Sequence, residues 1–388
     1  MRMRMSRLHA VVVALPMFAV MTPLASAQIA VSSNDGKAVL VNGVNSIPSP
    51  VADDTVTILD LGASPPKVLG EVKAPSSVAG PPQNVAIAPD ESIALVAASL
   101  RIDPNDPKKL VPDNRVTVID LKANPPAVIA TLEAAPGASG TSINRAGTLA
   151  LVANRNDGSV SIFTIAGKTV APAGKVAVGT ATSVPSSVAF TPDGKMALVS
   201  RYGDHKISVL AIDGNNVTDT KQTMTGSYQP YAIQVSPKGD IAVVGSQGGN
   251  TGDIDTINVI DLRGKAPRIV HTLDVGQIVE GLAFSNDGNY IALTAQDGSA
   301  RPPTHPFYNE HGLVAIFGVN GTNLTKAAEL RVGKWNQGVV WSRDGKTLLT
   351  QSMVDKALFV LSFDGNALKT VGEIKVNGSP EGLRTAER

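Results

Sequence analysis

Residues 187–200 read SVAFTPDGKMALVS, and the pattern returns as GLAFSNDGNYIALT at 281–294 and as GVVWSRDGKTLLT at 338–350. In each copy a short apolar run leads into Asp-Gly, and a second apolar run follows. Asp-Gly between two such runs is typical of a tight β-hairpin turn, in which the glycine takes a positive φ. The pattern therefore predicts pairs of antiparallel strands, repeated along the chain.

The repeat covers most of the sequence. Its turns fall at residues 35, 90, 146, 193, 238, 287 and 344, with spacings from 45 residues (193 to 238) to 57 residues (287 to 344). A third strand recurs, as in VTVIDL at 116–121 and INVIDL at 257–262, and a weaker fourth follows, as in RIVHTL at 268–273. Seven units of four strands predict an all-β, seven-bladed β-propeller, because a single blade cannot bury both of its faces.

The C-terminus predicts how the ring closes. Glu381-Gly382-Leu383 matches Glu280-Gly281-Leu282 in register, so we expect residues 381–385 to supply the inner strand of the blade whose other strands come from residues 37–72. In the alternative arrangement, residues 28–33 fill this position. Residues 28–388 are expected to form one propeller domain.

The N-terminus has the features of a secretory signal peptide. A basic start with Arg2 and Arg4 precedes an apolar run, and Ala25-Ser26-Ala27 is a cleavage motif of small residues. We therefore expect residues 1–27 to be removed before Gln28 and the protein to be periplasmic or secreted. The net charge of +1 predicts neither a nucleic-acid partner nor a basic membrane-binding patch, and no later stretch predicts membrane insertion.

The repeated units resemble the YVTN-type β-propeller repeat of exported bacterial proteins of the YncE-like and surface-layer type. They are more distantly similar to lactonase-type propellers. The resemblance rests on units such as 187–200 followed by ISVLAI at 207–212, with LVAN at 151–154 and LVSR at 198–201 in the place of the tetrapeptide. It implies the propeller fold, and it allows lactone hydrolysis as one activity.

The long connections should all lie on one face. They fall between the second and third strands of their blades, at residues 42–53, 99–114, 246–255 and 295–311, whereas the opposite face carries only tight turns. Long loops on a rigid scaffold usually carry function, so we expect the functional surface on this face. In the alternative, the loops are tolerated insertions without a role.

The residue before each inner strand should point to the mouth of a central channel. All seven are polar: Gln83, Ser139, Ser186, Tyr231, Glu280, Gln337 and Glu381. Arg155 and Arg201 end the second strands of adjacent blades, and arginine can bind a carboxylate or phosphate through two hydrogen bonds. The ring predicts a site for a small polar or anionic ligand, unless its polarity reflects only contact with water.

The segment RPPTHPFYNEHG at 301–312 is the most distinctive insertion. It brings His305, Tyr308, Glu310 and His311 into one loop, which could form a packed lid, contact a ligand or hold a metal ion. No phosphate-binding glycine loop, nucleophile elbow or Cys/His zinc pattern occurs, so the sequence assigns no metal and no cofactor.

Three functions fit these features. The preferred one is a scaffold that binds a small polar ligand, or a protein or glycan partner, at the channel mouth. The alternative is a lactonase-type hydrolase or isomerase, with Glu280 or His305 as general base and Arg155 or Arg201 as anion clamp. Ligand contacts in either case would come from the ring, Tyr308 and His311. A subunit of a periplasmic redox complex is a further alternative.

Overall fold

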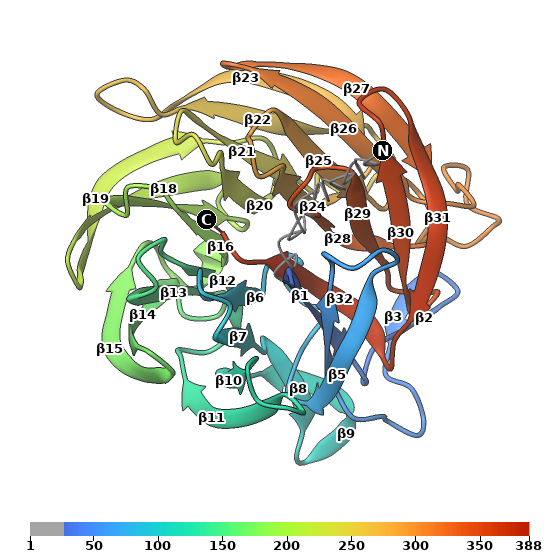
Figure 1. Cartoon of the computed structure of the whole chain (residues 1–388), viewed down its shortest axis with the longest axis horizontal. Helices are drawn as coiled ribbons and strands as arrows, with labels where there is room; N and C mark the ends of the chain where they lie inside the picture. The colour runs from blue at the N-terminus through green and yellow to red at the C-terminus, as the bar shows by residue number, and fades with distance from the viewer. Residues whose placement is uncertain (1–26, 388) are drawn as a thin grey trace, which may run out of the picture.

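The computed structural model describes residues 27–387, and in this range it is a ring of seven antiparallel blades (Figure 1). The one helix in this range is a short 3-10 turn, Ala181–Ser183. The fold class predicted from the repeat is therefore confirmed. Residues 27–387 include no helix long and apolar enough to cross a membrane. The expected signal peptide lies almost wholly outside the described residues.

From the central axis outward, the blades are formed as follows. Blade 1 contains β32 (Ser379–Thr385), β1 (Ile29–Asp35), β4 (Thr55–Asp60) and β5 (Lys67–Lys73); blade 2 contains β6 (Val85–Ile87), β7 (Ile93–Ala97), β10 (Arg115–Asp120) and β11 (Ala127–Glu133). Blade 3 contains β12 (Ala138–Ile143), β13 (Leu149–Asn154), β14 (Ser159–Ala166) and β15 (Thr169–Ala177); blade 4 contains β16 (Pro185–Phe190), β17 (Met196–Arg201), β18 (Lys206–Asp213) and β19 (Asn216–Thr225). Blade 5 contains β20 (Pro230–Val235), β21 (Ile241–Ser246), β22 (Asp255–Asp261) and β23 (Arg268–Gly276); blade 6 contains β24 (Val279–Phe284), β25 (Tyr290–Ala295), β26 (Leu313–Asn320) and β27 (Asn323–Arg331). Blade 7 contains β28 (Asn336–Trp341), β29 (Thr347–Ser352), β30 (Ala357–Phe363) and β31 (Leu368–Lys375).

Burial follows from the position of each strand in its blade. The second strands are covered on both faces by neighbouring blades, so all five residues of β7 (IALVA) are buried. The outer strands have one face in solvent, and in β5 exposed and half-buried residues follow one another. One hydrophobic cluster joins Ile241 of blade 5 to Leu293 of blade 6, which shows how each blade covers the next.

The C-terminal strand closes the ring as predicted. In blade 1, β32 is the inner strand and pairs antiparallel with β1, with Ser33 opposite Gly382. The alternative is wrong, because β1 is the second strand and pairs with β4 on its other edge. The assignment of Asp35-Gly36 to a hairpin turn is also wrong. Asp35 ends β1, and the other three strands of blade 1 span residues 29–73 rather than 37–72.

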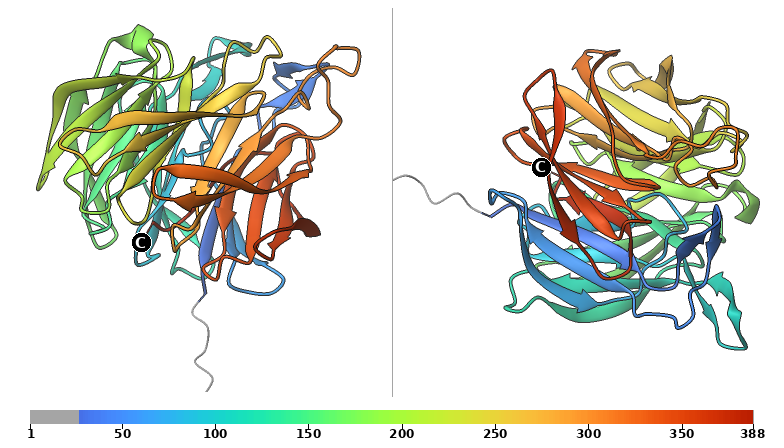
Figure 2. Two further views of the ribbon diagram at one scale, coloured as in Figure 1. Left: turned by 90° about the horizontal axis from the view of Figure 1, so that it is seen from above. Right: turned by 90° about the vertical axis from the view of Figure 1, so that its right-hand side faces the viewer.

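The two faces of the ring differ as expected. The loop side carries the connections 36–54, 98–114, 247–254 and 296–312, and the turn side carries the hairpin turns 144–147, 191–194, 236–239, 285–288 and 342–345. Two small hairpins, β2 (Val39–Val41) with β3 (Val44–Ser46) and β8 (Leu100–Asp103) with β9 (Asp106–Pro112), project from the loop side, opposite the start of β1 (Figure 2).

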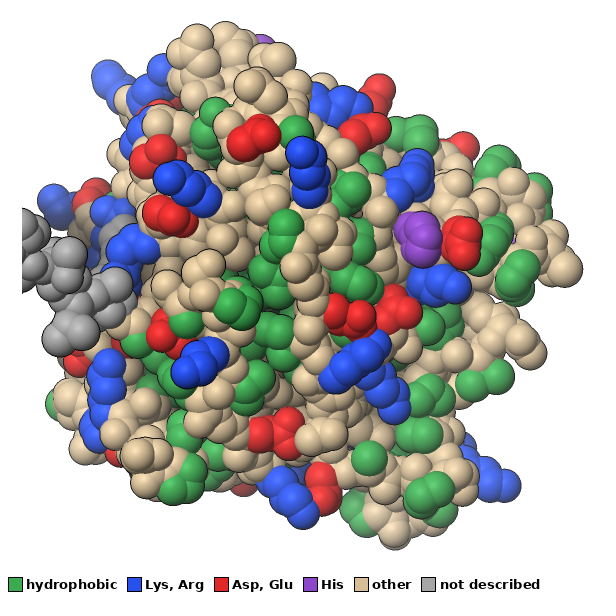
Figure 3. Space-filling model, turned by 45° about the vertical axis from the view of Figure 1, so that its right-hand side comes forward, with side chains coloured by type: hydrophobic (Ala, Val, Ile, Leu, Met, Phe, Trp, Pro, Cys, Tyr) green, Lys and Arg blue, Asp and Glu red, His purple; other side chains and the backbone are tan. Residues whose placement is uncertain are grey.

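Surface charge is mixed in the oblique view of Figure 3, where lysine and arginine lie next to aspartate and glutamate without a large patch of one sign. This distribution agrees with the net charge of +1.

Candidate functional site

The seven predicted ring residues occupy equivalent positions at the loop-side ends of the inner strands. In blades 3 to 7 each is the second residue of its strand, and the pairing with the neighbouring strand is interrupted there by a β-bulge. A bulge re-aims a side chain that would otherwise follow the regular pleat. All seven residues are at most 5% exposed, so they form a buried polar ring instead of a wet rim.

Several ring residues carry a buried polar atom without a hydrogen-bond partner among the described residues. These atoms are Ser139 Oγ, Glu280 Oε2, Gln337 Oε1 and Glu381 Oε2. Leaving a buried acceptor unpaired costs free energy, and such groups are normally satisfied by protein or by water. Hydroxyl, amide and carboxyl oxygens can accept a hydrogen bond, and a protonated carboxyl can also donate one, so the ring is suited to water or to a hydroxyl-rich ligand.

Glu280 is one of two ring carboxyl groups whose pKa is strongly raised. Its Oε1 accepts hydrogen bonds from Gln296 Nε2 at 2.6 Å and from Trp335 Nε1 at 3.3 Å. Burial raises the pKa of Glu280 to about 7, although interactions with Gln296, Trp335, Gln247 and Gln337 act in the opposite direction. A carboxyl group that titrates near neutral pH can take up and release a proton during a reaction.

Arg155 lies in the same region. Its guanidinium donates to Ser186 Oγ at 2.8 Å, and its carbon lies 5.4 Å from the ring centre of Tyr202 and 5.9 Å from that of Tyr231. Burial raises the pKa of Tyr231 well above 10; the charge of Glu280 adds to this shift and that of Arg155 opposes it. A carboxylate and a guanidinium thus act on one buried tyrosine.

Arg201 and Gln83 are engaged in the fold. Arg201 forms an ion pair with Asp204 and also donates to Ser183 and Ser208, each at 3.2 Å. The Gln83 side chain donates to Ile233 O at 3.1 Å and accepts from Ile233 N at 3.0 Å. Because Gln83 belongs to blade 2 and Ile233 to blade 5, this amide connects the two blades across the central axis.

The 301–312 segment contacts the loop of blade 5, and the hydrogen bonds found for the His305 side chain stay within the segment. His305 Nε2 lies 3.0 Å from Arg301 Nη1, and its Nδ1 accepts from Phe307 N at 3.2 Å. Arg301 in turn donates to Asn250 Oδ1 at 3.0 Å in the loop of blade 5. The hydrogen bonds found for Tyr308 and His311 involve their backbone only. No hydrogen bond joins any of these side chains to the ring within residues 27–387.

One residue just before this segment contacts the tryptophan that donates to Glu280. Ser299 Oγ accepts from Trp335 N at 2.9 Å, and the indole of Trp335 donates to Glu280. Within the described residues, no group of three or more His, Cys, Asp or Glu lies close enough to hold a metal ion.

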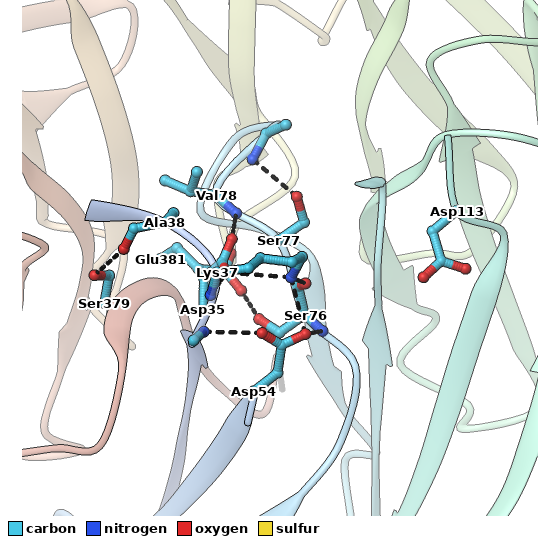
Figure 4. Close-up of polar contacts among 12 residues, drawn as sticks. Asp35, Lys37, Ala38, Asp54, Ser76, Ser77, Val78, Asp113, Ser379 and Glu381 are labelled. Carbon is cyan, nitrogen blue, oxygen red and sulfur yellow. Dashed lines mark hydrogen bonds and ion pairs between the residues drawn. The ribbon is translucent and has the colours of Figure 1, made fainter. Parts of the chain in front are cut away.

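A buried ionic cluster supports the ring at Glu381 (Figure 4). Lys37 Nζ lies 2.8 Å from Asp54 Oδ2 and 3.2 Å from Asp35 Oδ1, and it also donates to Ser76 O. Ser76 Oγ donates to Glu381 Oε1, and burial raises the pKa of Glu381 to about 8. The sequence does not reveal this cluster, because Asp35-Gly36-Lys37 matches the pattern of a hairpin turn.

The cluster also holds a cap loop, residues 78–82, over the ring. Asp35 Oδ2 accepts from Val78 N at 2.9 Å at the start of the loop. Gly80 has a φ of +127°, and a Cβ at this position would lie 2.2 Å from Ser139 Oγ. Only glycine permits this backbone conformation and this close approach, so Gly80 allows the cap loop to contact the ring directly.

A cavity of about 220 Å³ opens on the turn side, at the other end of the axis. It is lined by the ends of inner strands and by the hairpin turns of blades 3 to 7, and none of the predicted site residues contributes to it. Its charged residues are Arg145, Arg343, Arg384 and Glu387. A sequence signal existed, because Arg145 and Arg343 occupy the turn position that holds Pro or Asn in blades 4 to 6.

Comparison with known proteins shows the propeller fold, together with a family match over part of the chain. A family model described as "Lactonase, 7-bladed beta-propeller" matches residues 172–280, and no curated protein matches the chain. The periplasmic gluconolactonase of Pseudomonas aeruginosa has a similar structure, with a TM-score of 0.68 and 18% identity over 92% of this chain and 99% of that one.

Two further structures show the same fold. A candidate 6-phosphogluconolactonase from Bacteroides uniformis has a TM-score of 0.65 and 15% identity over 93% of this chain and 100% of that one. Hydrazine synthase from Kuenenia stuttgartiensis has a TM-score of 0.60 and 18% identity over 80% of this chain and 91% of that one. The fold alone therefore accommodates different chemistries.

Proposed function

We propose that this protein is an exported lactonase-type hydrolase that opens a small hydroxylated lactone inside the buried ring. One observation carries the proposal: Glu280, whose pKa is raised to about 7, has an unpartnered oxygen within a ring of further unpaired acceptors. The partial match of residues 172–280 to a lactonase family model supports it. These findings favour hydrolysis over a binding scaffold.

The ring is suited to the alcohol groups of a sugar lactone. Hydroxyl groups would donate to Ser139 Oγ and Gln337 Oε1 and accept from the protonated carboxyl of Glu381, polar groups with an unpaired atom among the described residues. Pairing these atoms removes the cost of burying them, and an analogue without hydroxyl groups would not do so. Entry from the loop side requires the cap loop to move, as lids do in many enzymes.

Each step of the reaction can be assigned to a residue. The carboxylate of Glu280 takes a proton from water as the water oxygen bonds to the lactone carbonyl carbon. The carbonyl oxygen becomes an oxyanion, which the guanidinium of Arg155 stabilises. When the carbonyl reforms, the ring C–O bond breaks, and the leaving oxygen receives the proton from Glu280. The product is the open-chain hydroxy acid.

The test compares the wild-type mature protein with Glu280→Gln, using D-glucono-1,5-lactone and subtracting its spontaneous hydrolysis. Loss of a general base should lower kcat/KM roughly 10²- to 10⁴-fold. Glu310→Gln is the matched control, because Glu310 is exposed on the loop side, and it should retain full activity. Equal activity of Glu280→Gln and wild type, or no activity of wild type on any hydroxylated lactone, would contradict the proposal.

A further inference from the structure

The turn-side cavity has apolar walls and a cationic opening. Phe190, Leu282, Phe284 and Trp341 line it, all from the inner strands of blades 4, 6 and 7. The indole N–H of Trp341 donates to Ala283 O at 2.9 Å, so this ring needs no polar partner from a ligand. The volume of about 220 Å³ exceeds the roughly 150 Å³ in which an apolar protein cavity accepts benzene.

Arg384 is the buried cation of this cavity. It lies near the end of β32, its side chain is 9% exposed, and burial lowers its pKa to about 10. The one ion pair found for it within residues 27–387 is with Glu387, three residues further along the same segment. A guanidinium removed from water gains most from an anion that approaches it in the same cavity.

Two more arginines reach the opening from the hairpin turns. Arg145 donates to Pro237 O at 2.8 Å, and no carboxylate within residues 27–387 lies within ion-pair distance of it. Arg343 lies 3.4 Å from Glu91, outside the cavity lining, and 41% of its side chain remains exposed. Three guanidinium groups thus face one carboxylate, Glu387, among the lining residues.

The cavity is separate from the polar ring. The Gln83 amide spans the axis between blades 2 and 5, and the ring lies at the opposite ends of the same inner strands. A ligand in the cavity would therefore contact neither Glu280 nor the cap loop.

We propose that the turn-side cavity is a second binding site, for a small organic anion with an apolar body and one carboxylate or phosphate group. The apolar body packs against Phe190, Phe284 and Trp341, where burial of its surface contributes to affinity. The anionic group binds Arg384, with Arg145 and Arg343 adding charge at the opening. This site does not depend on the proposed lactone hydrolysis.

Calorimetric titration of the full mature protein with benzoate and with phenyl phosphate tests the site, with benzyl alcohol as the neutral control. Both anions, or one of them, should bind, while benzyl alcohol binds at least tenfold more weakly. Added salt should weaken anion binding, because the arginines at the opening are partly exposed. The stronger of the two anions identifies the preferred anionic group.

Variants locate the binding. Arg384→Gln should weaken the anion roughly tenfold to a hundredfold, since hydrogen bonds to charged groups are among the strongest in proteins. Arg155→Gln, at the polar ring, should leave the affinity unchanged. If Arg384→Gln does not fold, as judged by circular dichroism, Arg145→Gln and Arg343→Gln decide, and one of them should weaken binding severalfold.

The two tryptophans of the chain provide an independent readout, because Trp341 lines the cavity and Trp335 contacts Glu280. In Trp335→Phe the remaining indole should change its fluorescence on addition of the anion, and in Trp341→Phe it should not. No binding of either anion at millimolar concentration would overturn the proposal. So would loss of binding in Arg155→Gln, or unchanged binding in all three cavity variants.

Discussion

Replacing Lys37 by methionine should strongly destabilise blade 1, although the substitution changes the side-chain volume little. The lysine side chain is 6% exposed and lies between Asp35, 2% exposed, and Asp54, 16% exposed. Burial alone would lower the pKa of Lys37, but the charges of Asp35 and Asp54 raise it, so the lysine is charged in the folded protein. Methionine fills a similar volume and leaves both carboxylates without their cation.

The expected loss follows from the behaviour of other buried ion pairs. Removing one partner of such a pair costs about 3–5 kcal/mol, because the other charge stays buried and uncompensated. The urea dependence of unfolding grows with chain length, and a slope on the order of 3–4 kcal/mol per molar applies to a chain of this size. The urea midpoint of Lys37→Met should therefore fall by about 1 M.

Urea unfolding followed by circular dichroism gives the midpoints, and the chain offers a matched control. Lys73 pairs with Asp53 in the same blade, but the two side chains are 78% and 65% exposed, so Lys73→Met should leave the midpoint unchanged. Adding Asp35→Asn and Asp54→Asn to Lys37→Met should recover part of the loss, since no buried charge then lacks a partner. Equal midpoints for Lys37→Met and Lys73→Met would refute this reasoning.

Two further predictions concern closure and pH. Leu383 lies in β32 and is 1% exposed, so Leu383→Ala should lower the free energy of unfolding by roughly 2–4 kcal/mol. Deletion of residues 379–388 should lower it further. Val371 on β31 is 61% exposed, so Val371→Ala should have no measurable effect on the urea midpoint. Retention of the wild-type midpoint after the deletion would contradict closure by β32. Burial raises the pKa of Glu280 to about 7 and of Glu381 to about 8, so the folded protein keeps protons that the unfolded chain releases near pH 4.5. The free energy of unfolding should therefore decline as the pH rises from about 4.5 to 8, and it should decline less in the double variant Glu280→Gln/Glu381→Gln. Urea midpoints at pH 5 and pH 8 measure the difference. Parallel pH profiles of wild type and double variant would count against buried, protonated carboxyl groups.

Local sequence patterns predicted most of the fold, because every blade of a propeller repeats the same strands and turns. Asp-Gly between alternating apolar runs correctly predicts a hairpin at Asp193 and Asp287. The same dipeptide at Asp35 follows the second strand of its blade, because the inner strand β32 lies more than 340 residues away in sequence. A long connection and not a hairpin turn therefore begins there. The closure itself could be predicted, because Glu381-Gly382-Leu383 repeats the register of an ordinary inner strand.

The candidate site was only partly predictable. Register placed all seven ring residues at equivalent positions, but it could not show which polar atoms are paired. Arg155 and Arg201 occupy similar positions in the sequence. Their roles differ because Asp204, three residues after Arg201, forms an ion pair with the Arg201 guanidinium. Lys37 was missed because Asp35-Gly36-Lys37 has the pattern of a hairpin turn, and Arg384 because a strand residue next to a cavity has no distinctive local pattern.

The pH dependence of kcat/KM for lactone hydrolysis tests the central claim most directly. If Glu280 is the general base, the rate should rise with pH through an apparent pKa of about 7, after subtraction of spontaneous hydrolysis. Gln296→Leu removes the 2.6 Å hydrogen bond that favours the charged carboxylate, so the inflection should move to higher pH. A flat profile between pH 5 and 9, or an inflection that does not move in Gln296→Leu, would contradict the role assigned to Glu280.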